Sequence, residues 1–240
     1  EAAFDPKTAR CKGRRVKAMG AIILSETPLP KPSNQVARAG FLAHLREAGF
    51  APSGLQASVQ SFCRRTDCLG RVLDEAWPSL TEAELQATVA DWLGTALGNG
   101  GFQLPSPSTV LNALKAQLDW KHAQDLDALA PTQFQLASGR KAPIDWLNER
   151  APLIECRVQE LYGSARHPAI ARGRVPITLQ MLSPGGKPVA TTQDLPNFWS
   201  GGYQDMAKDM RGRYPKHDWP DDPATATPHE GMTKARLAKR

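Results

Sequence analysis

A short segment near the carboxyl end of the chain combines cationic and aromatic side chains in a pattern suited to nucleic-acid chemistry. Cations attract phosphates, and flat rings can stack on exposed bases. The same cations are also typical of a solvated helix terminus, because the helix dipole favours positive charge there. Both interpretations remain open, and the candidate nucleic-acid-binding residues in this segment are Lys208, Arg211, Arg213, Tyr214, Lys216, His217 and Trp219.

A second basic stretch lies near the amino end, between Arg10 and Ala18. It contributes Arg14 and Arg15 to the candidate nucleic-acid-binding residues. The stretch runs into the apolar residues Ala21–Leu24, and together they predict two strands with the basic strand at a sheet edge. Lysine and arginine on an edge strand commonly prevent aggregation, so a protected edge and a phosphate-binding strand both fit the sequence.

Motifs for nucleotide hydrolysis are missing from the sequence. A P-loop ends in Gly-Lys followed by Ser or Thr, whereas Gly186-Lys187 is followed by Pro188. Residues 74–77, Asp-Glu-Ala-Trp, match a DEAH box in three letters, but no apolar strand precedes them. Without a phosphate cradle and a magnesium ligand, we expect no catalytic residues and no ATP or metal cofactor in this chain.

The other residues that could do chemistry do not form a recognisable site. His217, Asp221 and Asp222 could in principle bind a metal, but two adjacent aspartates between prolines point to different sides, which favours a capped turn. The four cysteines show neither a CxxC pair nor zinc spacing, so we expect free thiols in a reducing cytoplasm. No apolar run is long enough to predict a membrane span.

The composition is that of an ordinary globular protein, with 41% hydrophobic residues among 240. The net charge of +6 and the pI of about 9.3 permit an anionic partner without requiring one. Residues 73 to 91 are net acidic, so the basic charge lies mostly at the two ends of the chain, and this segregation is more informative than the total. The chain begins without Met in a strand-like pattern, which we interpret as a piece of something longer.

The elements that position these residues predict an α+β fold with four parts. Residues 1–30 are expected to be β-rich, and residues 31–130 helical, with a capping box at Thr81 and Glu84. Residues 131–217 read as hairpin, helix (152–162), hairpin and helix (from Asp194 to Gly212), which predicts an antiparallel sheet with helices on one face. Residues 218–240 are expected to be a disordered, basic tail.

Several strings along the chain occur, in the same order, in the HrpB family of bacterial ATP-dependent RNA helicases, which are relatives of the DEAH-box proteins. They include Met19–Glu26, Gln159–Gly163, Leu182–Pro188 and, most specifically, Gly212–His217 followed by Trp219–Pro223. The chain resembles the C-terminal region of that family over nearly its whole length. The resemblance implies a parent protein that uses ATP and magnesium to remodel RNA. Because the motor is missing here, we expect no catalysis by this chain alone.

Two functions remain open on this basis. In one, the chain is an accessory module that contacts RNA or single-stranded nucleic acid beside the motor, with Tyr214 and Trp219 stacking on bases. In the other, it docks on the motor domains or on a separate protein, and the same aromatic residues fill an apolar groove. The sequence does not support a third function, that of an independent enzyme, because it contains no recognisable Ser/His/Asp arrangement.

Overall fold

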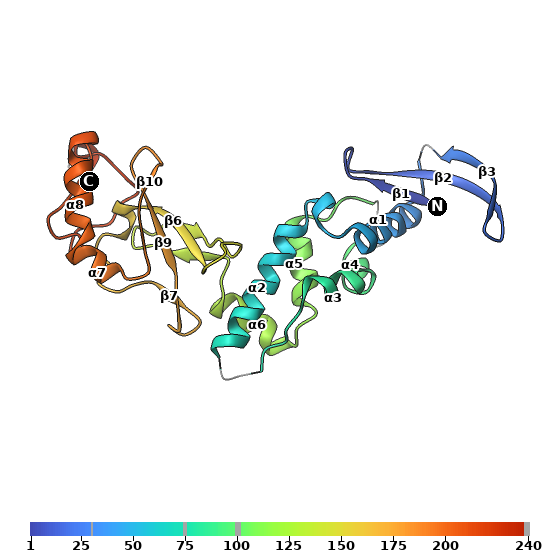
Figure 1. Ribbon diagram of the computed structural model, residues 1–240, viewed down its shortest axis with the longest axis horizontal. Coiled ribbons are helices and arrows are strands. Elements are labelled where there is room, and N and C mark those ends of the chain that lie inside the picture. The colour runs from blue at the N-terminus through green and yellow to red at the C-terminus, as the bar shows by residue number, and fades with distance from the viewer. Residues whose placement is uncertain (30, 74–75, 99–101, 238–240) are drawn as a thin grey trace. The chain divides into compact units, whose positions relative to one another are not determined.

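The computed structural model describes residues 1–29, 31–73, 76–98 and 102–237 (Figure 1). The chain packs as two compact units, Glu1–Asp125 and Leu126–Arg240. Helices and strands are both well represented, so the α+β class predicted from the sequence is confirmed. The finer division into four parts stays a prediction. Within the ranges just given, no helix is long and apolar enough to cross a membrane.

The first unit begins with a three-stranded antiparallel sheet in the order β1-β2-β3, where the sequence predicted two strands. The strands are β1 (Ala2–Asp5), β2 (Arg10–Met19) and β3 (Ile22–Leu29). Gly20 has a φ of 61°, the left-handed conformation that a two-residue turn between β2 and β3 requires. Strand β3 is the outer edge, and the β2–β3 hairpin extends beyond the helices of its unit (Figure 1).

The sheet is anchored to the first helix through its short strand. Phe4 of β1 is buried, and its ring meets the ring of Phe41 edge-on at a centroid distance of 5.0 Å. Gly40 allows this close approach, because a Cβ there would lie 2.3 Å from the carbonyl oxygen of Ala2. The base of the sheet is therefore fixed, while the hairpin beyond it is exposed.

Helices make up the rest of the first unit. Their apolar faces form its core, and Thr81 and Glu84 make the predicted capping box: the Glu84 N–H donates to Thr81 Oγ1 at 3.2 Å and the Thr81 N–H to Glu84 Oε2 at 2.9 Å. The boundary between the units falls within α6. The helices are α1 (Asn34–Ala48), η1 (Ala51–Ser53), α2 (Gln56–Val72), α3 (Glu82–Ala87), α4 (Val89–Ala96), α5 (Pro107–Lys115) and α6 (Trp120–Leu129).

The second unit contains a three-stranded sheet and two small hairpins. The hairpin of β4 (Gln133–Gln135) and β5 (Lys141–Pro143) was predicted. The sheet has the order β10-β9-β6, with β6 (Leu153–Arg157), β9 (Thr178–Leu182) and β10 (Pro188–Thr192). Between β6 and β9 lies a second hairpin, β7 (Ala169–Ile170) and β8 (Val175–Pro176).

The helix predicted over residues 152–162 is wrong. Residues Leu153–Arg157 form β6, and only a short 3-10 turn follows, η2 (Val158–Leu161). The buried residues Ile154, Cys156 and Val158 alternate along the chain, which is the period of a strand. Because β6 lies parallel to β9, the sheet is mixed rather than antiparallel.

The single helix predicted from Asp194 to Gly212 is two helices. Asp194 caps α7 (Leu195–Ser200) as expected, with its Oδ1 accepting from the Asn197 N–H at 3.1 Å. The chain then leaves helical geometry at Gly201, and α8 (Gly202–Arg213) follows. The sequence places an apolar stripe along this helix at Leu195, Trp199, Tyr203, Met206 and Met210, and all of these except the half-buried Met206 are buried.

Residues 214–233, here called the C-terminal strap, are packed, although the sequence predicted disorder from residue 218 onwards. Trp219 and His229 are buried, and the Pro223 carbonyl accepts from the Gly163 N–H at 2.9 Å. A β-bridge joins His217 to Thr233, and the short helix α9 (Lys234–Leu237) follows. Trp219 and Pro223 are buried against the rest of the unit, and the largely polar composition of the segment gave no indication of this packing. Residues 238–240 of the predicted tail lie outside the described residues.

Candidate nucleic-acid interface

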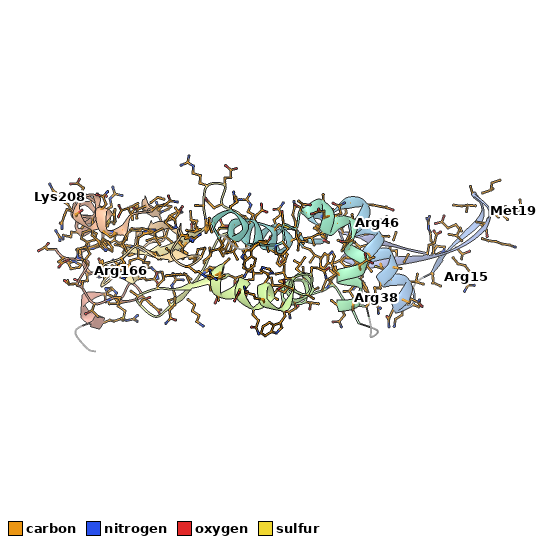
Figure 2. The ribbon with its side chains drawn as sticks, turned by 90° about the horizontal axis from the view of Figure 1, so that it is seen from below. Arg15, Met19, Arg38, Arg46, Arg166 and Lys208 are labelled. Atoms are coloured by element: carbon orange, nitrogen blue, oxygen red, sulfur yellow. The ribbon has the colours of Figure 1, made fainter. Side chains whose placement is uncertain are left out.

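The predicted cations at the end of α8 are exposed, but two of them already have partners. Arg211 Nη2 donates to the Trp219 carbonyl at 2.8 Å and pairs with Asp221 Oδ1 at 2.7 Å. Arg213 Nε lies 3.1 Å from Asp209 Oδ1, one helical turn away. Lys208 is exposed and forms no ion pair within the described residues (Figure 2). The helix terminus therefore offers less available charge than its sequence indicates.

The aromatic residues Tyr214 and Trp219 pack against other parts of the second unit. Trp219 is 5% exposed, and its Nε1–H donates to the Tyr214 carbonyl at 3.2 Å. Tyr214 is half-buried against the β9–β10 turn, where a Cβ added to Gly185 would lie 2.6 Å from its hydroxyl oxygen. Stacking on a base and filling a partner's groove both require an exposed ring. Trp219 is not available for either role, which corrects the sequence expectation.

The remaining members of the segment are Lys216, which is exposed, and His217, which is half-buried with its ring 6.2 Å from that of Tyr214. Lys216 makes no ion pair in the part of the chain that the structure describes. Residues 202–222 contain five aspartates against four lysines and arginines, so the local charge is nearly balanced. Lys208 and Lys216 are the predicted cations of this segment that remain available to a phosphate.

The hairpin of the first unit presents a different arrangement. Arg14 is engaged, with its guanidinium 3.3 Å from Glu26 and 3.2 Å from Glu1. Arg15 is exposed and points away from its unit at the hairpin, near Met19 (Figure 2). Lys17 is also exposed, and neither cation forms an ion pair among the residues described. Arg14 is therefore a structural partner, whereas Arg15 is an available cation.

Strand geometry adds two hydroxyls to this surface. Residues two apart share one face of a strand, so Arg15 and Lys17 project together. In the antiparallel register, Arg15 lies opposite Thr27 and Lys17 opposite Ser25, and both hydroxyl residues are exposed. Opposed side chains have Cβ atoms about 4.5–5.5 Å apart, so the four can contact one phosphodiester segment. We call these four residues the basic ladder: Arg15, Lys17, Ser25 and Thr27.

Sequence reasoning missed Lys17 and Arg166 as candidate residues. Lys17 follows Arg15 at the spacing of one strand face, a signal that the sequence does carry once β2 is recognised. Arg166 is exposed in the loop before β7 and makes no ion pair with any described residue (Figure 2). Its loop position gave no periodic signal, so only the three-dimensional structure identifies it as available.

The described residues form neither a metal-binding cluster nor a phosphate cradle. The described residues contain no group of three or more His, Cys, Asp or Glu side chains that could hold a metal ion. Asp221 pairs with Arg211, and Asp222 accepts from the Ala224 N–H at 3.1 Å, as expected for a capped turn. Gly186 lies in the turn between β9 and β10 rather than before a helix, so it does not form a phosphate cradle. In the DEAH-like string, Asp74 and Glu75 lie outside the described residues.

The four cysteines are free, as predicted. Burial raises the pKa of Cys63 to about 11 and that of Cys156 to about 12. Thiols with such pKa values remain protonated near neutral pH and are poor nucleophiles. Cys68 and Cys156 are buried and pack as small apolar groups in the first and second unit respectively, while Cys11 and Cys63 are half-buried.

Comparison with known proteins shows where this chain belongs. A family model described as "ATP-dependent helicase C-terminal" (HrpB_C) matches residues 92–223. The chain is 33% identical over 227 residues to the ATP-dependent RNA helicase HrpB of Escherichia coli (strain K12), covering 94% of this chain and 28% of that protein.

Solved structures give the same result. A crystal structure of the E. coli DExH-box NTPase HrpB superposes with a TM-score of 0.68 at 31% identity, covering 96% of this chain and 29% of that one. A structure of the Escherichia coli DEAH/RHA helicase HrpB gives a TM-score of 0.59 at 29% identity, with 91% and 28% covered. The chain spans less than a third of these relatives' length. The matched model covers more than half of the chain, which therefore belongs to the HrpB C-terminal family of ATP-dependent helicases.

Proposed function

We propose that the chain is the C-terminal accessory region of an ATP-dependent RNA helicase and that it binds RNA, or other single-stranded nucleic acid, beside the motor. The basic ladder is the observation that carries this proposal. Arg15 and Lys17 lie on one exposed face without carboxylate partners in the described residues, and Thr27 and Ser25 stand opposite them. All four side chains carry hydrogen-bond donors, and phosphate oxygens of a nucleic-acid backbone are acceptors for such donors.

The role of such a surface is to hold a strand rather than to cut or modify it. Each phosphate contact by a lysine or arginine releases condensed counterions, and this release supplies most of the sequence-independent affinity. Lys208 and Lys216 are two further exposed cations, in the second unit. ATP turnover belongs to the motor of the longer helicase, and the cytoplasm is the expected location of the complex.

Binding of the full chain to a fluorescent single-stranded RNA, measured across a salt series, tests the proposal. The expected result is an affinity that falls steeply with salt, and a shallower slope in the double variant Arg15→Gln, Lys17→Gln. A charge-matched control, Arg46→Gln with Lys141→Gln, removes two exposed cations elsewhere and should retain most of the slope. Affinity that is absent, or that does not respond to salt, contradicts nucleic-acid binding.

A second candidate function, docking on the motor domains, is favoured by the end of the same hairpin. Four large apolar side chains there are more than half exposed: Met19 at 66%, Ile22 at 62%, Ile23 at 55% and Leu24 at 54%. We call them the apolar tip. Consecutive exposed residues leave both faces of β3 uncovered, and β3 is also an edge strand. Such a surface is typical of one that another protein covers.

The docking candidate is tested by mixing the chain with separately produced motor domains of the same helicase. The double variant Ile23→Ser, Leu24→Ser should lose association, while its RNA affinity and salt slope stay unchanged. Trp120→Ser is a matched control, because Trp120 is 76% exposed but lies on α6, away from the hairpin. Equal loss of association in both variants contradicts docking through the apolar tip.

A further inference from the structure

A polar cleft lies on the sheet of the second unit, and its lining includes none of the candidate residues above. Its volume is about 680 Å³, within the range of about 300–1,000 Å³ that is typical of small-molecule sites. Hydroxyl, carboxamide and charged side chains dominate its lining, and Leu153 is the apolar exception. The lining residues are Asn148, Glu149, Arg150, Leu153, Thr178, Gln180, Thr191, Thr192 and Gln193.

The floor of the cleft is built from two rows of side chains that cross the strands. In one row, Gln180 of β9 lies between Glu155 of β6 and Thr191 of β10. The second row contains Thr178 of β9, beside Leu153 of β6. Two residues along a strand span about 6.6 Å, so the rows present hydrogen-bonding groups at two levels of the same sheet face.

Hydrogen bonds hold two carboxamides of the lining in place, Gln180 in the first row and Gln193, which follows β10. Gln193 Nε2 donates to Thr178 Oγ1 at 2.8 Å, and Gln180 Nε2 donates to Glu155 Oε1 at 2.8 Å. Each of these contacts uses one N–H of a group that has two N–H donors and a carbonyl acceptor. Each carboxamide therefore keeps one N–H donor beside its carbonyl acceptor, and this pattern pairs with the edge of a nucleobase.

The wall of the cleft is a loop with a defined conformation. Asn148 Oδ1 accepts hydrogen bonds from the backbone N–H groups of Arg150 at 3.2 Å and Ala151 at 3.5 Å. This turn fixes the backbone from which the exposed Arg150 side chain projects. The cleft therefore combines a preorganised floor, where Glu155 accepts a hydrogen bond from Gln180, with a wall that carries Glu149 and Arg150.

The charge of the lining indicates the kind of ligand. Arg150 and Glu149 offset each other, and the Glu155 carboxylate of the floor accepts from Gln180, so the cleft is not an anion trap. Its many neutral donors and acceptors require a ligand rich in such groups. We propose that the cleft binds the base and ribose of one unpaired nucleotide of single-stranded RNA, with Arg150 on the adjoining phosphate. This inference rests on the proposed function and adds a base-contacting site to its phosphate-contacting surface. An extended peptide would instead pair with the backbone edge of β10, which is not what lines the cleft.

The test compares two RNA oligomers of the same length, one with bases and one abasic, binding to the full chain at a fixed salt concentration. The base-bearing oligomer should bind the wild-type chain about five-fold or more tightly, the lower end of the discrimination of a good bidentate contact. Gln193→Ala and the isosteric Thr178→Val should reduce this ratio towards one without changing the salt slope. Gln133→Ala, an exposed glutamine on β4, should leave it unchanged.

The outcomes separate this inference from the proposed function. Salt-dependent binding with a ratio that neither variant changes overturns the cleft site and leaves the phosphate-binding surface intact. If no oligomer binds, the proposed function fails, and the cleft is tested directly with the four ribonucleoside monophosphates by NMR. Binding there that Gln193→Ala abolishes supports the site for free nucleotides. Absence of nucleotide binding, including a case in which only an extended peptide binds, overturns it.

Discussion

The basic ladder and residues 202–222, here called the α8–strap segment, are both rich in cations in the sequence, yet they present very different surfaces. On the ladder, strand alternation sends Arg15 and Lys17 to one face, and Glu26 is engaged by Arg14. In the α8–strap segment, Arg211 is held by the Trp219 carbonyl and by Asp221, both of which the strap brings to the end of α8. The number of positive residues in a segment therefore does not measure the charge that a ligand meets. The carboxylates and carbonyls within reach decide it.

The largest effect that tests this comparison is the loss of Trp219. Trp219→Ala should lower the free energy of unfolding of the second unit by about 3–5 kcal/mol, because a buried indole and its hydrogen bond are lost. Urea unfolding, followed by hydrogen exchange of the α8 amides, measures the change. The matched control Trp120→Ala removes an exposed ring and should change stability by less than about 0.5 kcal/mol. Unchanged stability together with lost RNA affinity would restore Trp219 as a base-stacking residue.

Arg211 gives the next largest effect. Arg211→Met removes the two N–H donors that the Trp219 carbonyl accepts and leaves Asp221 unpaired. We expect a loss of about 1–2 kcal/mol, moderated by the partial exposure of the pair. Arg213→Met, which breaks an exposed i, i+4 pair with Asp209, should cost no more than about 0.5 kcal/mol. Equal losses in chemical denaturation would show that Arg211 does not fasten the strap.

The third prediction compares the two regions directly through RNA binding. Removing Arg15 and Lys17 together should weaken binding about tenfold at low salt and reduce the salt slope by about 1.4, because two available cations are lost. Removing Arg211 and Arg213 should change the slope less, since their charges already face Asp221 and Asp209. Fluorescence anisotropy at several salt concentrations measures both slopes. The comparison fails if the α8 pair gives the larger change.

The smallest expected effect is a pH dependence confined to the second unit. Burial lowers the pKa of His229 from its ordinary value of 6.5, and its Nδ1 accepts a hydrogen bond from the Met232 N–H at 3.0 Å. Below about pH 6.5 the unfolded chain binds a proton that the folded unit resists, so stability is full above that pH and decreases as the pH falls through the interval below it.

His229→Gln should reduce this loss of stability, measured by urea unfolding between about pH 5 and 8. His167 retains part of the dependence in that variant, because burial lowers its pKa as well. The segment of the ladder, residues 10–29, contains no histidine, so RNA binding there should not follow the same curve. An identical pH profile in the variant and the wild-type chain would assign the effect to other groups.

Local signals in the sequence predicted much of the fold. The capping box at Thr81 and Glu84, the β4–β5 hairpin and the cap at Asp194 depend on neighbouring residues, and all three are present. The errors came from non-local packing. The short apolar run around Ile154 and Val158 fits a helix or a strand equally well, and only its pairing with β9 decides between them.

The candidate site was predictable only in part. Residue types identified the cations, but their availability depends on partners that are distant in the sequence, such as Asp221 for Arg211. The polar cleft left no motif, since its lining comes from three strands and from two separate loop segments. Trp219 carried a misleading signal, because an aromatic residue among prolines and charges resembles an exposed binding element until the strap is seen to bury it.

The C-terminal strap also determines when the second unit can be completed. Its Pro223 carbonyl and the His229 backbone N–H close on Gly163 and Gln159, residues that were synthesised some 60 positions earlier, and Thr233 pairs with His217. The hydroxyls of Tyr162 and Tyr203 donate to the Asp218 and Pro220 carbonyls of the strap. During translation, these two tyrosines therefore lack part of their packing until residues up to 233 have left the ribosome. The strap, which is made after α8 and all strands of the sheet, is therefore the segment that seals the interior of the unit.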